Sequence, residues 1–136
     1  MTTATRLPIR TEHDIVAARQ HGRELAERTG FEGSELTVIA TAISELARNI
    51  VQYAERGEME FAAATDNGRR GIVIVATDEG PGIPDVERAL EDGYSTSRSL
   101  GLGLPGARRL MDEFEISSTV GEGTTIKVTK WVSEPS

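Results

Sequence analysis

The sequence predicts a two-layer α/β sandwich, in which helices cover one face of a mixed, mostly antiparallel sheet. The expected elements follow the order helices, hairpin, helices, hairpin. Hairpins pair their strands in antiparallel fashion, and the amphipathic helices between them must bury their apolar sides against the sheet. The 136 residues contain no linker and no internal repeat, so residues 1–136 are expected to form one domain.

The chain opens with a short strand or lead-in at residues 6–10, and a helix over residues 11–30 follows. Thr11 and Asp14 have the spacing of a capping arrangement at a helix start, and Gly30 is typical of a helix stop. This first helix is expected to bury an apolar stripe made of Ile15, Val16, Leu25 and Ala26.

The helical signal is strongest from Ser34 to Tyr53, where apolar residues recur at spacings of three and four. This period predicts one broad buried face, with the polar side chains on the opposite side of the helix. The apolar set is Val38, Ile39, Ala42, Ile43, Leu46, Ile50 and Val51, and the polar set is Thr41, Glu45, Arg48, Asn49 and Gln52.

The second half of the chain alternates strands and short helices. A hairpin is expected from residues 58–65 and 71–77 around the turn sequence DNGRRG, and a short helix at 84–91. Residues 93–103 are rich in Gly and Ser, which indicates a loop. The remaining elements are a helix at 104–114 with Leu110, Met111 and Phe114 facing inward, and a final hairpin of residues 115–120 and 124–132.

The composition excludes several classes of function. The absence of cysteine excludes disulfides and thiolate metal sites. A net charge of −7 argues against general nucleic-acid affinity, and an aromatic content of 4% argues against base-stacking surfaces. No apolar run approaches the roughly 18 residues of a membrane span, and residues 1–10 lack the apolar run of a signal peptide. We therefore expect a cytoplasmic protein with neither membrane nor nucleic-acid partners.

Asp78 is the first candidate site residue, because it follows a buried-type strand and begins the sequence DEGPG. A carboxylate there can accept a hydrogen bond from a planar donor in a pocket, such as an exocyclic adenine amine. Gly80 and Gly82 would let the main chain approach a ligand closely. The alternative is a tight turn in which Asp78 accepts hydrogen bonds from local backbone N–H groups.

Glu45 and Asn49 are the second candidates. They are i,i+4 neighbours in the sequence SELARN and project from the same, polar side of the expected helix. A carboxylate beside a neutral amide suits a general base next to an oxygen ligand for Mg²⁺. The alternative is an exposed polar stripe of the kind that amphipathic helices commonly carry. Arg48, between the two, is expected to pair with an acid or to face water rather than to contact phosphate.

Two glycine-rich segments complete the candidates. GLGLPG, residues 101–106, stands where a loop turns into a helix, so its unpaired N–H groups would be open to an anion. The preceding YSTSRS, which contains Arg98, could fold over a bound polyphosphate as a lid. GEGTT, residues 121–125, lies in the late hairpin. The alternatives are a flexible linker for the first segment and an ordinary hairpin turn for the last.

The order and spacing of these four segments resemble the GHKL ATPase superfamily, which includes gyrase, histidine kinases and MutL. There the four motifs line one ATP pocket on an α/β sandwich of the Bergerat type. Longer stretches, among them TAISELARNIVQYA and DEGPGIPDVERALEDGYSTSRSLGLGLPGARRLMDEFEI, are similar to RsbT-type switch serine/threonine kinases. This similarity extends from about Ile9 to Trp131, which is the expected core of a single histidine-kinase-like ATPase domain.

The resemblance implies ATP and Mg²⁺ as cofactors. Asn49 would bind Mg²⁺, Glu45 would orient or deprotonate the attacking hydroxyl, and Asp78 would accept the adenine amine. Main-chain N–H groups of the glycine-rich loop would face the phosphates, and Arg98 would stand in for a lid lysine that this sequence lacks. Glu45 is the expected catalytic residue, and the expected cofactor-binding set is Asn49, Asp78, Gly80, Gly82, Arg98, Gly101, Leu102, Gly103, Leu104 and Thr124.

The resemblance also implies a function. It is that of a kinase which phosphorylates a STAS-domain protein in a partner-switching, stressosome-type module. Once released, such a kinase activates a partner such as a PP2C-type phosphatase. One alternative is an anti-sigma factor of the RsbW class, which binds a sigma factor and phosphorylates its antagonist. Another is a pseudoenzyme that binds ATP only as a switch. A monomer or weak dimer is expected.

Overall fold

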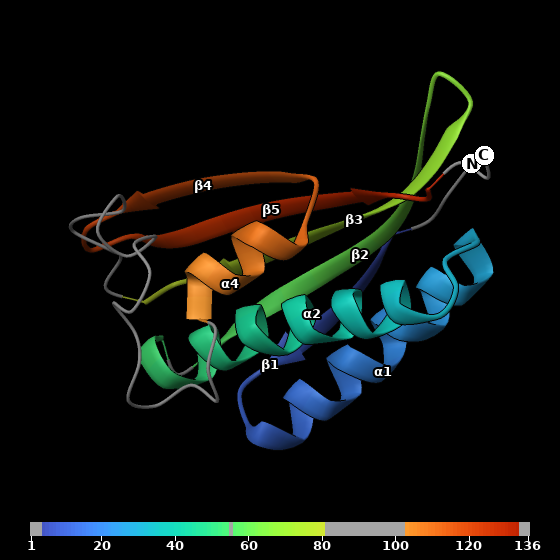
Figure 1. Ribbon diagram of the computed structural model, residues 1–136. Coiled ribbons are helices and arrows are strands. Elements are labelled where there is room, and N and C mark those ends of the chain that lie inside the picture. Colours follow the sequence, from blue (N-terminus) through green and yellow to red (C-terminus); the bar gives the residue numbers. More distant parts are fainter. Residues whose placement is uncertain (1–3, 55, 81–102, 134–136) are drawn as a thin grey trace.

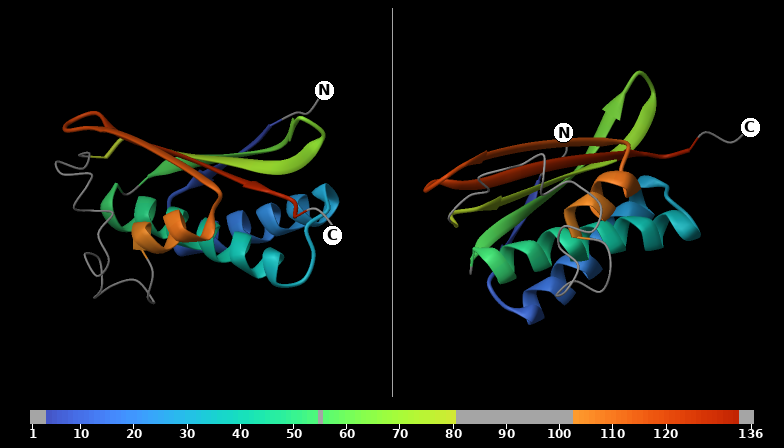
Figure 2. Two further views of the ribbon diagram at one scale, coloured as in Figure 1. Left: turned by 45° about the horizontal axis from the view of Figure 1, so that its top comes forward. Right: turned by 60° about the vertical axis from the view of Figure 1, so that its left-hand side comes forward.

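The computed structural model describes residues 4–54, 56–80 and 103–133 and has two layers (Figure 1). The described elements are β1 (Thr5–Ile9), α1 (Glu12–Thr29), α2 (Ser34–Tyr53), β2 (Gly57–Asp66), β3 (Arg69–Asp78), α4 (Gly103–Leu110), β4 (Glu113–Thr119) and β5 (Gly123–Trp131). The strands form one five-stranded sheet in the order β1-β2-β3-β5-β4, in which every neighbouring pair is antiparallel. The three helices lie on the same face of this sheet (Figure 2). The predicted fold class is confirmed.

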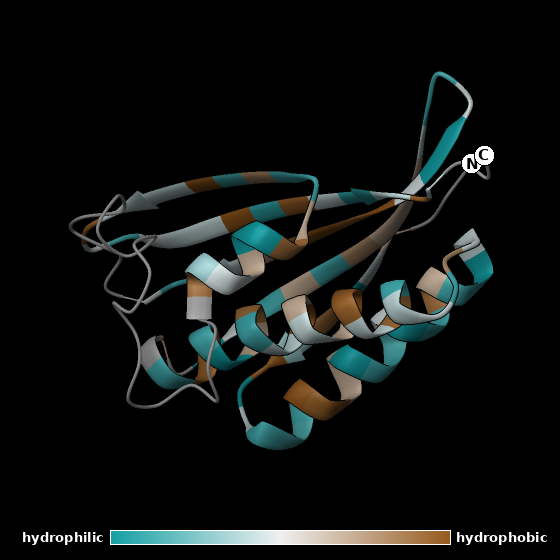
Figure 3. Ribbon diagram, in the orientation of Figure 1, coloured by the Kyte–Doolittle hydropathy of each residue, from teal (hydrophilic) through white to brown (hydrophobic). Residues whose placement is uncertain are grey.

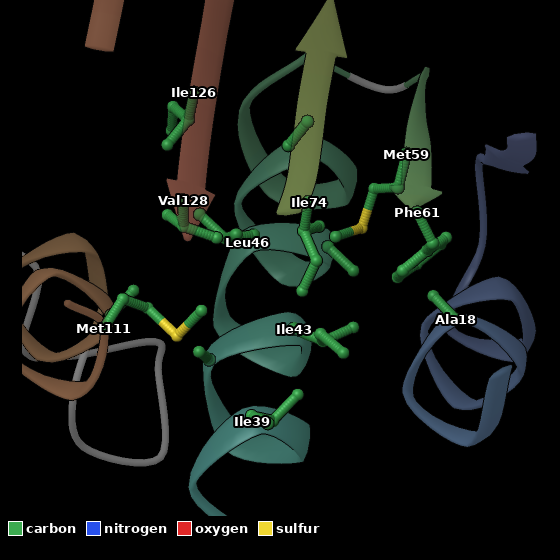
Figure 4. Packing of buried hydrophobic residues seen from close by; sticks show 14 of the residues in the cluster. Ala18, Ile39, Ile43, Leu46, Met59, Phe61, Ile74, Met111, Ile126 and Val128 are labelled. Atoms are coloured by element: carbon green, nitrogen blue, oxygen red, sulfur yellow. The ribbon is translucent and has the colours of Figure 1, made fainter. Parts of the chain in front are cut away.

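α2 is the central element of the helical layer, with its predicted bounds Ser34–Tyr53 confirmed. Ile39, Ile43 and Leu46 point from α2 toward the sheet, where they meet side chains such as Ile74 and Val128 (Figure 4). The helices carry hydrophobic and hydrophilic residues side by side, as expected where one side is buried (Figure 3). The core therefore lies between α2 and the middle strands of the sheet.

The capping arrangement predicted for α1 is confirmed. One carboxylate oxygen of Asp14 accepts hydrogen bonds from the backbone N–H of Arg10 at 2.9 Å and of Thr11 at 3.1 Å. The helix runs from Glu12 to Thr29, with Gly30 after its last residue. The local sequence signals thus set both ends of this helix.

The prediction that Val16 belongs to the buried apolar stripe of α1 was wrong. Val16 is 50% exposed, whereas its neighbour Ile15 is 5% exposed. The buried side of α1 continues from Ile15 through Ala18 and Gly22 to Ala26 at helical spacing. Val16 lies about 100° further around the helix, so it faces solvent.

The helix expected at residues 104–114 is shorter than predicted. α4 ends at Leu110, and Phe114 lies in β4, where it is the register partner of Val128. Pairing of β4 with β5 involves residues distant in sequence, so it overrides the local helical pattern. The first hairpin also differs from the prediction. Its turn contains only Asn67 and Gly68, because both adopt the positive φ angles (51° and 81°) that a two-residue hairpin turn requires.

The helix expected at residues 84–91 and the loop at 93–103 lie outside the described residues, apart from Gly103 at the start of α4. Among the helices that the structure describes, none is long and apolar enough to cross a membrane.

Because of the hydrogen bonds to Asp14, we expect the stability of the protein to depend on pH. The backbone N–H of Arg10 is the main cause that holds the pKa of Asp14 below its usual value of 3.8. Because the folded-state pKa is lowered, this stabilisation is present above about pH 4 and is lost as the pH falls through the lowered value. We expect Asp14→Asn to reduce the free energy of unfolding by up to about 1 kcal/mol at pH 7. The deficit should shrink below pH 4.

Urea unfolding at pH 7 and pH 3 measures this difference. Glu12→Gln removes the same charge from the same helical turn and is the control, since the side chain of Glu12 makes no hydrogen bond or ion pair with any residue in the described part of the chain. Equal deficits for Asp14→Asn at both pH values would contradict the assignment.

Candidate functional site

One end of the sheet brings together residues from three strands. Asp78, the last residue of β3, is the register partner of Gly57 on β2 and of Thr124 on β5. Side chains of directly opposed residues point to the same face of a sheet. Asp78 also shares its face with Ala76, which is 3% exposed and belongs to the core. Asp78 and Thr124 therefore lie side by side on the face that the helices cover.

The C-terminal end of α2 packs against this same end of the sheet. A Cβ placed on Gly80 would lie 2.6 Å from Cβ of Ala54, the residue after α2. A Cβ on Gly57 would lie 2.9 Å from Cγ2 of Ile50. These contacts leave no room for larger residues and put Asn49, which precedes Ile50, at the same end of the domain as Asp78. The structure thus places Asn49, Asp78 and Thr124 at one end of the domain.

Asp78 is half-buried, and its Oδ1 accepts a hydrogen bond from the backbone N–H of Gly80 at 2.9 Å. Asp78 therefore does accept a hydrogen bond from a local backbone N–H group, which was the alternative interpretation of the sequence. This bond uses only one of its two carboxylate oxygens. Oδ2 accepts no hydrogen bond from any residue that the structure describes. An additional donor, such as a ligand amine, can bind there without displacing the turn.

Thr124 is 5% exposed, and its Oγ1 shares a hydrogen bond of 2.8 Å with Oγ of Ser118 on β4. The Ser118 hydroxyl also lies 3.2 Å from the carbonyl oxygen of Gly123, to which it can donate. These bonds hold the start of β5 against β4. Ser118 was not among the candidates predicted from the sequence, because its role depends on the β4–β5 register.

Gly123 has a φ of +119° and packs directly onto the carbonyl group of Asp78. A Cβ at this position would also lie 3.1 Å from Cα of Glu79. Only glycine adopts this backbone angle readily and fits this close approach. The β4–β5 turn therefore supports the main chain of the Asp78 segment.

Glu45 is 6% exposed, so the exposed-stripe alternative for this residue is wrong. All six residues from Ala42 to Ala47 are buried. Six residues exceed one helical turn of 3.6 residues, so this part of α2 is covered all around its circumference. The sheet covers one side, and α4 lies alongside α2 (Figure 1). Sequence periodicity could not reveal this, because it does not report the packing of a second helix.

Arg48 pairs with Glu45, so of the two alternatives favoured from the sequence, an acidic partner or contact with water, the structure shows the acidic partner. Its Nη1 lies 3.0 Å from Oε1 of Glu45, and the Arg48 side chain is 25% exposed. Asn49 is half-buried and follows Arg48 on the same helix. A buried carboxylate, its guanidinium partner and an amide thus occupy one short stretch of α2.

α4 begins at Gly103, and the side chain of Leu104 is 5% exposed within the core. The N–H groups of the first helical turn have no acceptor within the helix, and Pro105 has no N–H to contribute. The helix therefore leaves three backbone N–H groups without an acceptor of its own, and these could bind an anion. They belong to Gly103, Leu104 and Gly106.

A model of the family described as histidine kinase-like ATPase domain matches residues 7–130. The chain belongs to the histidine kinase-like ATPase family. It is 54% identical over 124 residues to serine/threonine-protein kinase RsbT of Bacillus subtilis (strain 168), covering 91% of this chain and 93% of that protein. It is 34% identical over 105 residues to the anti-sigma F factor of Caldanaerobacter subterraneus subsp. tengcongensis, covering 72% and 71%. The predicted resemblance to RsbT-type kinases is confirmed.

Four of the residues predicted for a histidine kinase-like ATPase site fall outside the described part of the chain. These are Gly82, Arg98, Gly101 and Leu102. Within the described ranges, no three His, Cys, Asp or Glu side chains cluster as a metal site. Mg²⁺ does not need such a cluster, since it is commonly held by one or two protein oxygens together with substrate phosphates. The amide oxygen of Asn49, close to Glu45 on α2, fits that donor chemistry.

A cavity of about 530 Å³ opens on the other face of the sheet from Asp78. Thr77 and Glu79 line it, since they alternate with Asp78 along the chain. Its arginines are largely compensated by acids, because Arg6 lies 2.8 Å from Glu60 and Arg56 lies 3.8 Å from Glu79. This cavity is separate from the residues assembled on the helix-covered face.

The contact of Gly123 with Asp78 yields a prediction with a matched control. Gly121, in the same turn, has a φ of +86° but nothing within 4 Å of an added Cβ. Gly121→Ala should cost about 1 kcal/mol of stability from backbone strain alone, and Gly123→Ala at least about twice that. Urea unfolding gives both values, and backbone amide NMR shifts of Asp78 and Gly80 should change only in Gly123→Ala. Equal stability losses would show that the contact is unimportant.

Proposed function

We propose that this chain is an ATP-dependent protein serine/threonine kinase that phosphorylates a STAS-domain protein in a partner-switching stress-signalling module. The observation that carries the proposal is the burial of Glu45, one helical turn before Asn49, on the helix whose C-terminal end packs against the Asp78 end of the sheet. The 54% identity to a protein named serine/threonine-protein kinase RsbT supports the same activity. A positioned base, a nucleotide-binding edge and a helix N-terminus open to phosphate are among the parts that phosphoryl transfer uses, together with a metal ion.

The adenine end of the proposed site is the Asp78 edge. Oδ2 of Asp78 would accept the adenine amine, while Oδ1 keeps its bond of 2.9 Å to the N–H of Gly80. Gly80, pressed against Ala54, keeps the main chain clear of the ring, and Gly82 is proposed to do the same. Thr124, next to Asp78 in the register, would lie near the adenine.

The phosphate end of the proposed site is the start of α4. The N–H groups of Gly103 and Leu104 point away from the helix body and would bind phosphate oxygens, where the helix dipole favours negative charge. We assign Gly101, Leu102 and Arg98 to the same task. Asn49 would hold Mg²⁺, and the ion would offset charge on the phosphates.

Glu45 is the proposed general base. It would accept the proton of a serine or threonine hydroxyl as that oxygen forms a bond to the γ-phosphorus. The bond from the γ-phosphorus to the bridging oxygen breaks, and its electron pair leaves with ADP. Such a step depends mainly on alignment and charge stabilisation, and a buried carboxylate on a rigid helix supplies alignment.

A second candidate function is that of an anti-sigma factor of the RsbW class. The 34% identity to an anti-sigma F factor favours this alternative, although it covers less of the chain. In the preferred proposal, the released kinase instead activates a switch partner such as a PP2C-type phosphatase. We propose that phosphorylation of the STAS-domain protein and activation of the switch partner both take place in the cytoplasm. We also propose that the protein is a monomer or weak dimer.

Transfer of labelled phosphate from ATP to the STAS-domain protein encoded nearest to this chain tests the proposal directly. Glu45→Gln should lower the transfer rate by about 10²–10⁴-fold, because it removes the proton acceptor, and should leave ATP affinity nearly unchanged. Glu24→Gln, at an exposed position of α1, controls for the loss of one negative charge. A normal rate in Glu45→Gln would remove Glu45 as the base. Stable binding of a sigma factor by the wild type would favour the anti-sigma alternative.

Asp78→Asn should weaken ATP binding by about 10–100-fold. The carboxylate would serve two donors, the N–H of Gly80 and the adenine amine, whereas an amide offers one acceptor and one donor group. Either orientation of the amide therefore sets a donor against a donor. Calorimetry with ATP measures the loss, and Asp66→Asn at the tip of the β2–β3 hairpin is the control. An unchanged affinity would exclude Asp78 from the adenine site.

A further inference from the structure

The ion pair between Glu45 and Arg48 is the most buried one between residues that the structure describes. The two side chains are 6% and 25% exposed, whereas the pair Arg6–Glu60 is 68% and 34% exposed and the pair Arg23–Glu27 is 57% and 58% exposed. Exposed pairs of the latter kind contribute little, because water screens them. The Glu45–Arg48 pair is less exposed to water, so the attraction between its charges is screened less and the orientation of its groups has more effect.

We propose that Arg48 is a positioning residue for phosphoryl transfer, which acts by holding the carboxylate of Glu45 and not by binding the phosphates of ATP. This inference rests on the proposed function, in which Glu45 is the base. It goes further by giving a role to Arg48, which lies between the two proposed site residues Glu45 and Asn49 on α2.

The geometry of α2 supports this role. Arg48 stands three residues after Glu45, at the spacing that brings two side chains of one helix together. The distance of 3.0 Å between Nη1 and Oε1 is that of a hydrogen bond, here between two oppositely charged groups. Both groups are attached to the same rigid helix, so their relative position does not depend on how a partner protein docks.

Burial supplies the energetic reason. A carboxylate that is taken out of water must be paired, or it becomes strongly destabilising. Arg48 offsets that charge, and as a planar group with fixed N–H directions it also restricts the orientation of the carboxylate. A base must be aligned with the hydroxyl it deprotonates, and small errors of alignment are costly in rate.

Two other roles for Arg48 make different predictions. A phosphate-binding arginine would contribute to ATP affinity whether or not Glu45 is present. A purely structural arginine would contribute to stability, and its loss would not lower the rate of the folded enzyme. A positioning arginine affects the rate only through Glu45, so its effect disappears when Glu45 is already replaced.

The experiment is a double-mutant cycle of Arg48→Met, Glu45→Gln and the double variant, with Arg48→Lys added. Arg28→Met, at an exposed position in the last turn of α1, is the matched control. Each variant is measured for single-turnover transfer to the STAS-domain protein at saturating ATP, for ATP affinity by calorimetry, and for its melting temperature. The double variant removes both charges of the pair, so it should fold even if Arg48→Met is badly destabilised.

We expect Arg48→Met to lower the transfer rate by about tenfold or more, with ATP affinity within about twofold of wild type. Arg48→Lys should recover part of the rate, because it keeps a positive charge but loses the planar donor geometry. The double variant should be as slow as Glu45→Gln, within about twofold, and melt above Arg48→Met.

Three results would overturn the inference. They are a normal rate in Arg48→Met, a loss of ATP affinity as large as the loss of rate, and a double variant clearly slower than Glu45→Gln. If Arg48→Met fails to fold, the transfer rates of the double variant and Glu45→Gln still show whether Arg48 acts only through Glu45. Failure of the proposed function looks different, because then Glu45→Gln itself transfers phosphate normally or the wild type transfers none.

Discussion

The packing of α2 on the sheet is the interaction on which the rest of the molecule depends. Ile39, Ile43, Leu46 and Ile50 lie at helical spacing along one side of α2, and none is more than 2% exposed. An apolar stripe of this kind fixes how the helix is rotated about its own axis, because any other rotation would expose several of these side chains to water. Once the rotation is fixed, the directions of Glu45, Arg48 and Asn49 follow.

The strand register is the second constraint, and it determines which side chains at this end of the sheet face the helices and which face the opposite side. Asp78 faces the helices with Thr124, while Thr77 and Glu79 line the cavity on the opposite face. A slip of one residue in β3 would exchange these sides and put Asp78 into the cavity. Close approaches at Gly57, Gly80 and Gly123 bring neighbouring chain segments together at this end. The candidate site therefore depends on the rotation of one helix and the register of three strands.

These constraints explain which features could be predicted from the sequence. The bounds of α2 follow from a local period, and the start of α1 follows from Thr11 and Asp14, so both were predicted correctly. The end of α4 depends on the pairing of Phe114 with Val128, residues that are far apart in the chain. A local pattern cannot contain that information, and the predicted helix was too long for this reason.

The same distinction applies to the candidate site. Asp78 and Thr124 were singled out separately, and only the β3–β5 register explains why they are neighbours. The burial of Glu45 depends on tertiary packing around α2, which a local sequence period does not report, so the polar side of α2 looked exposed in the sequence. Gly82, Arg98, Gly101 and Leu102 lie in the part of the chain that the structure does not describe, and their roles stay predictions.

The buried polar residues of the described chain show why the charge at position 45 calls for a functional explanation. Thr29 and Ser44 donate to backbone carbonyl oxygens one turn earlier in their helices, at 2.7 and 2.9 Å, so the helix itself satisfies them. Glu45 is the single charged residue in this buried set, and it needs a cation to offset its charge. An apolar side chain of similar volume would fill the same space and would often be as stable or more stable. Packing alone therefore does not account for a carboxylate here, whereas the proposed role of Glu45 as a buried, fixed and paired base would account for it.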